Sequence, residues 1–224
     1  MSMRDKNISL IFDIDGVVLD YVTSFFGWLN SEKGLEASIL PVEVNNFNLS
    51  RFFDHPSESF NRYYKEFGYS QSFKEIDCLE GILPLIHEMD RAGLHIHALT
   101  ACGDDVVSSA RKECLIGHGW LWPIDTVDLG ASKFEKLSQF EPSRSIFIDD
   151  LHHNLDDAHK LGMQTIWYKG IGKRYEDKGE LDIETPLVTS LPELKVSIAN
   201  SLDNIEPGLS KNILSKNRMM PEMS

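Results

Sequence analysis

Short apolar runs alternate with segments of helical periodicity along most of this chain. The run Ile-Ser-Leu-Ile-Phe at residues 8–12 is too short for a helix and predicts a buried strand. Similar runs predict further strands at 94–99, 123–129, 145–148 and 164–168. Apolar residues at helical spacing predict helices at 82–91, 104–115, 133–140, 152–161 and 191–202. Strands that alternate with helices in this way indicate βαβ units and a parallel sheet, and therefore an α/β fold.

Residues 21–80 differ from this rhythm. A helix is predicted at 21–33, where the apolar residues share one face and Gly34 suits the position after the last turn. A second helix is predicted at 56–67, closed by Gly68. Nine phenylalanine and tyrosine residues lie between positions 35 and 79, which indicates a small helical insert. Its rings either form the core of the insert or stack on a flat substrate group, and both interpretations stay open.

Composition supports a packed protein with one main domain. The chain has 224 residues, of which 42% are hydrophobic, enough for a sizeable core. We expect a core domain at residues 1–20 and 81–202 and a cap at 21–80. Residues 203–224 contain few apolar side chains, which predicts a flexible C-terminal tail. The net charge of −13 repels phosphate backbones, so a nucleic-acid polymer is not an expected partner.

Several features bear on location and on metals. The three cysteines show no CxxC spacing, which favours free thiols in a reducing compartment. The sequence lacks an apolar run of transmembrane length, and its polar start does not resemble a signal peptide. We therefore expect a cytoplasmic protein without a membrane partner, while the oligomeric state stays open. Eight histidines are present, but no cysteine stands at ligand spacing to them, so a zinc site is not expected.

Candidate site residues follow three of the predicted strands or begin a helix between them. In chain order they are Asp13, Asp15, Thr100, Ala101, Lys133, Asp149 and Asp150. Each of them alone has an ordinary interpretation, as a turn residue, a helix cap or a solvated lysine. Together they are expected to meet, because ligands bind beyond the carboxyl ends of the strands in an open α/β sheet. Clustered carboxylates repel one another unless a cation joins them, and oxygen ligands of this kind favour Mg²⁺.

These positions also resemble a known family. Phe-Asp-Ile-Asp-Gly-Val at 12–17, His-Ala-Leu-Thr at 97–100, Lys133 and Phe-Ile-Asp-Asp at 147–150 resemble, in order, the four motifs of the haloacid dehalogenase-like (HAD) superfamily. The resemblance covers about residues 8–20 and 81–170. It implies a Rossmann-like parallel-sheet core, and it implies that the insert is a cap that closes over the site and supplies specificity.

The resemblance also implies catalytic roles. Asp13 would be the nucleophile that forms an aspartyl-phosphate, and Asp15 would be the general acid and then the general base. Thr100 and Ala101 would hold the phosphate, and Lys133 would neutralise charge on the nucleophile and the phosphoryl group. Lys133 departs slightly from the common third motif, because Phe134 follows it in place of proline.

The implied cofactor is Mg²⁺. Asp150 aligns with the direct metal ligand of the family, and Asp149 would assist, although the sequence leaves their order open. The Asp13 carboxylate and the Asp15 carbonyl would complete the site. The metal would align a carboxylate and a phosphate whose like charges otherwise repel.

The implied activity is hydrolysis of a small phosphorylated metabolite. An aspartate two residues after the nucleophile favours phosphomonoesters over halides and phosphonates. The opening motif followed by an aromatic helix resembles 5′(3′)-deoxyribonucleotidase-like members, which makes a nucleoside monophosphate a candidate substrate. A phosphotransferase or sugar-phosphate mutase would use the same aspartyl-phosphate. A non-catalytic binding protein on this fold is a third interpretation, against which stands the presence of all four motifs.

Overall fold

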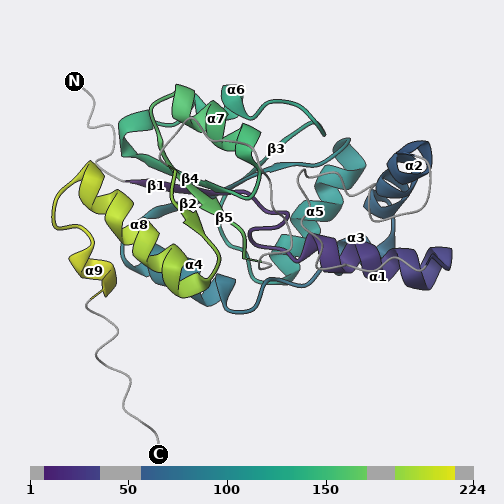
Figure 1. Cartoon of the computed structure of the whole chain (residues 1–224). Coiled ribbons are helices and arrows are strands. Elements are labelled where there is room, and N and C mark those ends of the chain that lie inside the picture. The colour runs from purple at the N-terminus through teal and green to yellow at the C-terminus, as the bar shows by residue number, and fades with distance from the viewer. Residues whose placement is uncertain (1–7, 36–56, 171–184, 215–224) are drawn as a thin grey trace, which may run out of the picture.

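The computed structural model describes residues 8–35, 57–170 and 185–214 (Figure 1). Its centre is a six-stranded parallel sheet in the order β3-β2-β1-β4-β5-β6. The strands are β1 (Ser9–Phe12), β2 (His95–Ala101), β3 (Ile124–Val127), β4 (Ser145–Asp149), β5 (Gln164–Tyr168) and β6 (Leu187–Val188). The chain moves outward from β1 through β2 to β3 and then returns to place β4 on the other side of β1. This reversal makes the gap between β1 and β4 the topological switch point of a Rossmann-like sheet.

Helices cover both faces of the sheet. Helix α7 packs on β4 and β5 and contacts α6, whereas α4 and α8 pack on β2, β5 and β6. Leu10 and Phe12 of β1 face one apolar cluster and Ile11 faces the other, which is why the central strands are apolar throughout. The helices are α1 (Tyr21–Lys33), α2 (Ser57–Gly68), α3 (Gln71–Lys74), α4 (Ile82–Arg91), α5 (Asp105–Gly117), α6 (Phe134–Leu137), α7 (His152–Lys160), α8 (Leu191–Ile205) and α9 (Lys211–Leu214).

The insert predicted from its aromatic residues contains α1, α2 and α3, which lie together at one end of the molecule (Figure 1). Its two connections to the sheet run side by side, because Leu19 bridges Cys78 and the Leu79 amide donates to the Val18 carbonyl at 2.8 Å. Helix α3 packs against α5 of the main domain. Side chains between the insert helices are mainly aromatic, with Phe67 at the centre of several ring contacts. Part of the predicted insert, 36–56, lies outside the described residues.

Most predicted elements are confirmed. Helix α1 has the predicted limits, and Gly34 takes the left-handed conformation that ends it. Helix α6 is shorter than predicted, because only Leu137 of this turn is buried while Phe134 remains 39% exposed. No helix in the described ranges is both long and apolar enough to cross a bilayer.

The C-terminal boundary needs a correction. Helix α8 continues past residue 202 to Ile205, and α9 follows it. Ile205, Leu209 and Ile213 are spaced four residues apart and pack on the main apolar cluster. Sparse apolar residues at that spacing are enough to attach the segment, so packed side chains reach Ile213 and helical structure continues to Leu214. The rest of the predicted tail, 215–224, lies outside the described residues.

Candidate active site

The predicted site residues gather at the carboxyl edge of the sheet, at its switch point. Asp13 directly follows β1, and its backbone amide donates to the Ile148 carbonyl of β4 at 2.8 Å. Asp149 is the last residue of β4, and Thr100 lies near the end of β2 on the other side of β1. Because the three strands are parallel and adjacent, their ends bring residues distant in sequence to one place.

Lys133 holds the centre of this cluster. Its Nζ donates to Asp13 Oδ1 at 2.6 Å and to Asp149 Oδ2 at 2.8 Å. The lysine side chain is only 1% exposed, so these two carboxylates replace its hydration. Burial by itself would lower the pKa of Lys133, but Asp13 and Asp149 outweigh it and raise that pKa above its ordinary value. The ammonium is therefore a permanent charge beside Asp13.

The neighbouring carboxylates Asp149 and Asp150 have different surroundings. Asp149 is saturated, because Oδ1 accepts from the Leu151 amide at 2.7 Å and both oxygens accept from the Asn154 side chain. Asp150 Oδ1 is buried and has no hydrogen-bond partner among the described residues. The unpartnered oxygen makes Asp150 the better direct ligand for a cation, and Asp149 serves to orient Lys133.

Gly16 is required for the position of Asp150. Its φ of 89° is in the left-handed region that favours glycine. A Cβ on this residue would lie 2.8 Å from Cγ of Asp150, closer than real contacts of this kind. The glycine after the Asp-x-Asp motif therefore lets the turn after β1 approach the acidic loop after β4.

The three clustered carboxylates of Asp13, Asp149 and Asp150 carry more negative charge than the ammonium of Lys133 compensates. Ligand atoms of Asp13, Asp149 and Asp150 lie within 4.8 Å of one another. Burial raises the pKa of Asp13 to about 7, although Lys133 opposes this rise. Burial, together with the charges of Asp149 and Asp13, raises the pKa of Asp150 well above its ordinary value. Clustered carboxylates with a free buried oxygen are the donor set of a hard divalent cation, so these residues fit Mg²⁺.

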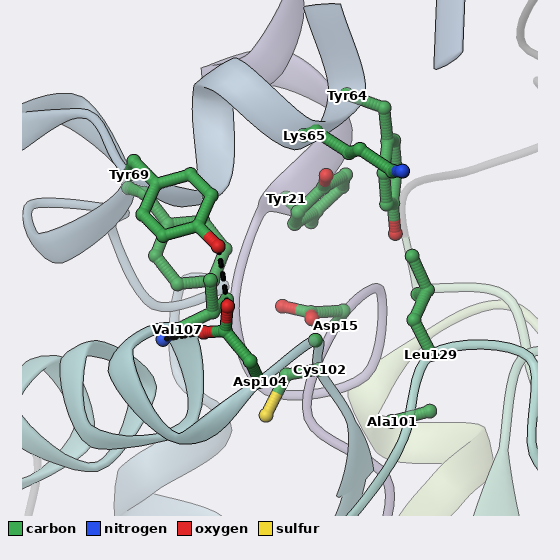
Figure 2. A pocket seen from close by; sticks show the side chains of 13 residues that line it. Asp15, Tyr21, Tyr64, Lys65, Tyr69, Ala101, Cys102, Asp104, Val107 and Leu129 are labelled. Carbon is green, nitrogen blue, oxygen red and sulfur yellow. Dashed lines mark hydrogen bonds between the residues drawn. The ribbon is translucent and has the colours of Figure 1, made fainter. Parts of the chain in front are cut away.

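A pocket of about 360 Å³ opens beside this cluster, between the sheet edge and the insert. Figure 2 shows the Asp15 side chain in its middle, with the Tyr21 ring above it and Tyr69 and Leu129 on opposite sides. Burial raises the pKa of Tyr64, another lining residue, to about 12, so its hydroxyl stays protonated. The pocket is lined by Asp15, Tyr21, Tyr64, Lys65, Gly68, Tyr69, Phe73, Ala101, Cys102, Gly103, Asp104, Val107 and Leu129.

The hydroxyl of Thr100 is another buried polar atom of this edge without a hydrogen-bond partner among the described residues. Thr100 is fully buried, and its Oγ1 accepts and donates no hydrogen bond within the described residues. Ala101, the next residue, lines the pocket. A hydroxyl in this state is suited to hold an oxygen of a bound anion, as the sequence predicts for a phosphate.

Asp15 faces away from the carboxylate cluster and pairs with a residue that the sequence did not suggest. Its Oδ1 lies 2.8 Å from an Nη of Arg111, whose side chain is fully buried. Burial raises the pKa of Asp15, while the Arg111 charge opposes that rise. The side chain of Asp15 is therefore not part of the carboxylate cluster. The predicted metal ligand from this residue is its backbone carbonyl oxygen.

Two residues that contact the site carboxylates, Arg111 and Asn154, escaped the sequence analysis, although each left a signal. Arg111 is four residues after Val107 and four before Leu115, so it breaks the apolar stripe of α5. Asn154 is a buried amide on α7, between Leu151 and Leu155 at the start of the helix. A polar side chain at an apolar position of an amphipathic helix indicates a buried partner, but it does not say which partner.

Comparisons with known proteins identify the fold. Protein-family models give no match to the sequence, and no curated protein is significantly similar to it. A predicted phosphatase from Clostridium acetobutylicum superposes with a TM-score of 0.62 at 17% identity, over 87% of this chain and 100% of that one. A HAD family hydrolase from Deinococcus radiodurans R1, with bound phosphate and sodium, gives 0.59 at 15% identity, over 90% and 99%. CbbY from Rhodobacter sphaeroides, in complex with phosphate, gives 0.52 at 20% identity, over 84% and 96%.

At these identities the similarity establishes the fold alone. The chain has the α/β fold of the HAD-like hydrolases, as its four motifs predict. Its motif residues lie at the carboxyl edge of the sheet, where the chemistry of an open α/β fold is usually located.

Proposed function

We propose that this protein is a Mg²⁺-dependent phosphatase that hydrolyses a small phosphomonoester through an aspartyl-phosphate on Asp13. The observation that carries the proposal is the buried cluster of Asp13, Lys133, Asp149 and Asp150. Lys133 occupies one oxygen of Asp13, while Asp150 Oδ1 and Thr100 Oγ1 are among the buried polar atoms that have no hydrogen-bond partner within the described residues. A cation and a phosphoryl group would satisfy these two atoms.

The chemistry follows from this arrangement in two steps. The carboxylate of Asp13 attacks phosphorus, and the bond from phosphorus to the ester oxygen breaks while Asp15 donates a proton to that oxygen. Water then attacks the phosphorus of the aspartyl-phosphate and gives a proton to the Asp15 carboxylate. The bond between phosphorus and the Asp13 oxygen breaks, so phosphate is released and both residues return to their starting states. Lys133 and Thr100 stabilise charge on the phosphoryl oxygens in both steps.

Mg²⁺ would be held by the carboxylates of Asp13 and Asp150 and by the Asp15 carbonyl, with Asp149 in support. When bound, it supplies positive charge that lets an anionic nucleophile meet an anionic phosphate. The fit rests on the free oxygen of Asp150 and on the close approach that Gly16 permits.

The pocket supports a small phosphorylated metabolite as substrate. Its volume of about 360 Å³ suits a group of metabolite size, and Asp15 projects into it toward a leaving oxygen. CbbY, which shares the fold, is solved in complex with phosphate and, as a mutant, with xylulose-(1,5)bisphosphate. The rings of Tyr21, Tyr64 and Tyr69 along the pocket favour a flat leaving group, so we include a nucleoside monophosphate as the finer proposal.

The test is phosphate release from nucleoside monophosphates, sugar phosphates and an aryl phosphate, with and without Mg²⁺. We expect Mg²⁺-dependent release, and we expect Asp13→Asn to lower it by about 10³-fold or more. Asp90→Asn, which removes an exposed carboxylate from the far helix α4, is the matched control and should retain wild-type rates. Equal rates for Asp13→Asn and the wild type would refute the nucleophile. A wild type that releases phosphate from no substrate would refute the function.

A further inference from the structure

Arg111 is a fully buried arginine whose position the proposed chemistry does not yet explain. It lies on α5, which belongs to the main domain, and its side chain has no exposed surface. Asp15 is the only carboxylate within 4.0 Å of it in the described part of the chain, at 2.8 Å. Burying an arginine is costly unless a carboxylate compensates its charge. The packing of α5 therefore ties Arg111 to the one aspartate that projects into the pocket.

Aromatic rings of the insert contact the Arg111 guanidinium. The Arg111 Cζ lies 3.9 Å from the centre of the Phe73 ring and 5.9 Å from that of Tyr21. Phe73 belongs to α3 and Tyr21 to α1, so both rings come from the insert. The guanidinium makes no hydrogen bond to the described residues, so its ion pair with Asp15 and its contacts with these rings are what hold it in place. Arg111 thus joins three parts of the molecule: the main domain, the loop of Asp15 and the insert.

We propose that Arg111 is the positioning residue of Asp15, and that Phe73 fixes the guanidinium so that the Asp15 carboxylate faces the leaving oxygen of the substrate. The inference rests on the proposed phosphatase function and assigns to that site a residue outside its four motifs. Arg111 neither lines the pocket nor belongs to the carboxylate cluster, so its assigned role is exerted through Asp15. Its contact with Phe73 makes the orientation of Asp15 depend on the insert being packed against α5.

The identity of the leaving group separates this role from a merely structural one. A misplaced general acid slows the departure of a basic alkoxide much more than that of a nitrophenolate, which leaves without a proton. A structural defect lowers both reactions alike. The informative quantity is kcat/KM, because it reports the steps up to departure of the leaving group, before the aspartyl-phosphate is hydrolysed.

The experiment compares kcat/KM for p-nitrophenyl phosphate with that for the best alkyl phosphate of the panel. For Arg111→Met we expect a loss of about 10²-fold with the alkyl ester and of less than about 5-fold with the aryl ester. Arg111→Lys keeps the charge but not the planar fork, and Phe73→Leu removes the ring, so both should show smaller losses in the same direction. Lys112→Met removes a cation from the next position of α5 and should leave the ratio unchanged.

Each outcome is decisive. An alkyl-selective loss supports the proposal, whereas an equal loss for both esters, or an unchanged ratio, overturns it. If Arg111→Met does not fold, Arg111→Lys and Phe73→Leu decide by the same ratio. A wild type that hydrolyses neither ester refutes the phosphatase function and this inference together, whereas an active wild type with unselective variants refutes only the role of Arg111.

Discussion

Replacing Lys133 with methionine tests the central charge cluster most directly. The substitution keeps a long unbranched side chain but removes the ammonium that separates Asp13 from Asp149. The side chains of the three residues are 1%, 7% and 0% exposed, so water does not screen the carboxylates that remain. Removing one partner of a buried ion pair costs about 3–5 kcal/mol. For a chain of this length, that corresponds to a fall in Tm of about 6–20 °C.

The pH dependence of this effect has a definite sign. The folded-state pKa of Lys133 is raised above its ordinary 10.5, so its stabilising effect is complete at neutral pH and is lost only as the pH rises through that higher value. Burial brings the pKa of Asp13 to about 7 although Lys133 lowers it, so below neutral pH this carboxyl is protonated in the wild type and still more so in the variant, which lacks the ammonium. A protonated Asp13 no longer repels Asp149. The Tm difference between wild type and Lys133→Met should therefore be larger at pH 8 than at pH 5.5.

Thermal unfolding in EDTA at the two pH values is the assay, repeated with Mg²⁺. Mg²⁺ that binds the carboxylates of Asp13 and Asp149, which have lost their ammonium partner, should raise the Tm of Lys133→Met more than that of the wild type. Lys136→Met is the matched control, because Lys136 is 34% exposed and pairs with an equally exposed Asp125. Such a pair contributes about 0–1 kcal/mol. A Tm of Lys133→Met within about 2 °C of the wild type at pH 8 in EDTA would refute the reasoning.

Three further predictions concern the metal and the insert. Gly16→Ala should weaken Mg²⁺ binding in calorimetry by about tenfold or more, because its Cβ would displace the Asp150 side chain and because the left-handed backbone at position 16 favours glycine; an unchanged Kd would contradict this. Mg²⁺ affinity should fall by about tenfold per pH unit below pH 7, since the metal competes with the proton on Asp13; a constant Kd between pH 5.5 and 8 would show that this carboxylate is not a ligand. Tyr69→Phe removes the hydrogen bond from the insert to Asp104, so kcat/KM should fall by a factor of about 2–5 while the free energy of unfolding changes by about 1 kcal/mol or less; unchanged kinetics would separate this contact from substrate binding.

Local signals in the sequence determined the elements and most of the candidate site. Helix α1 could be placed because an apolar face and the Gly34 that follows it are local signals; the structure adds Asp20, whose side chain caps the helix by accepting from the Thr23 amide. Strands β1 to β5 could be placed because they are short apolar runs between helices, whereas the two-residue β6 was not predicted. Once they form a parallel sheet, the residues after Phe12 and Ile148 must meet at one edge, so the sequence pattern alone places Asp13 near Asp149.

The tertiary structure decided how these residues differ from one another. The sequence leaves open which of Asp149 and Asp150 is the direct metal ligand. In the structure the Asn154 amide donates to both oxygens of Asp149, whereas Asp150 Oδ1 has no hydrogen-bond partner in the described residues. The aromatic residues of the insert divide in the same way: Phe67 is fully buried, whereas Tyr64 lines the pocket. Sequence patterns assign a residue to a face of its own helix, but they do not say what that face meets.

Arg111 shows the physical reason most clearly. Its place on the apolar stripe of α5 is a sequence signal of burial that the analysis of the sequence missed, and this signal does not say that Asp15 compensates its charge or that Phe73 contacts it. Helix periodicity depends on contacts three and four residues apart. The partner of a buried charge depends instead on how the sheet, α5 and the insert pack together, and only their assembly brings those three groups to one point.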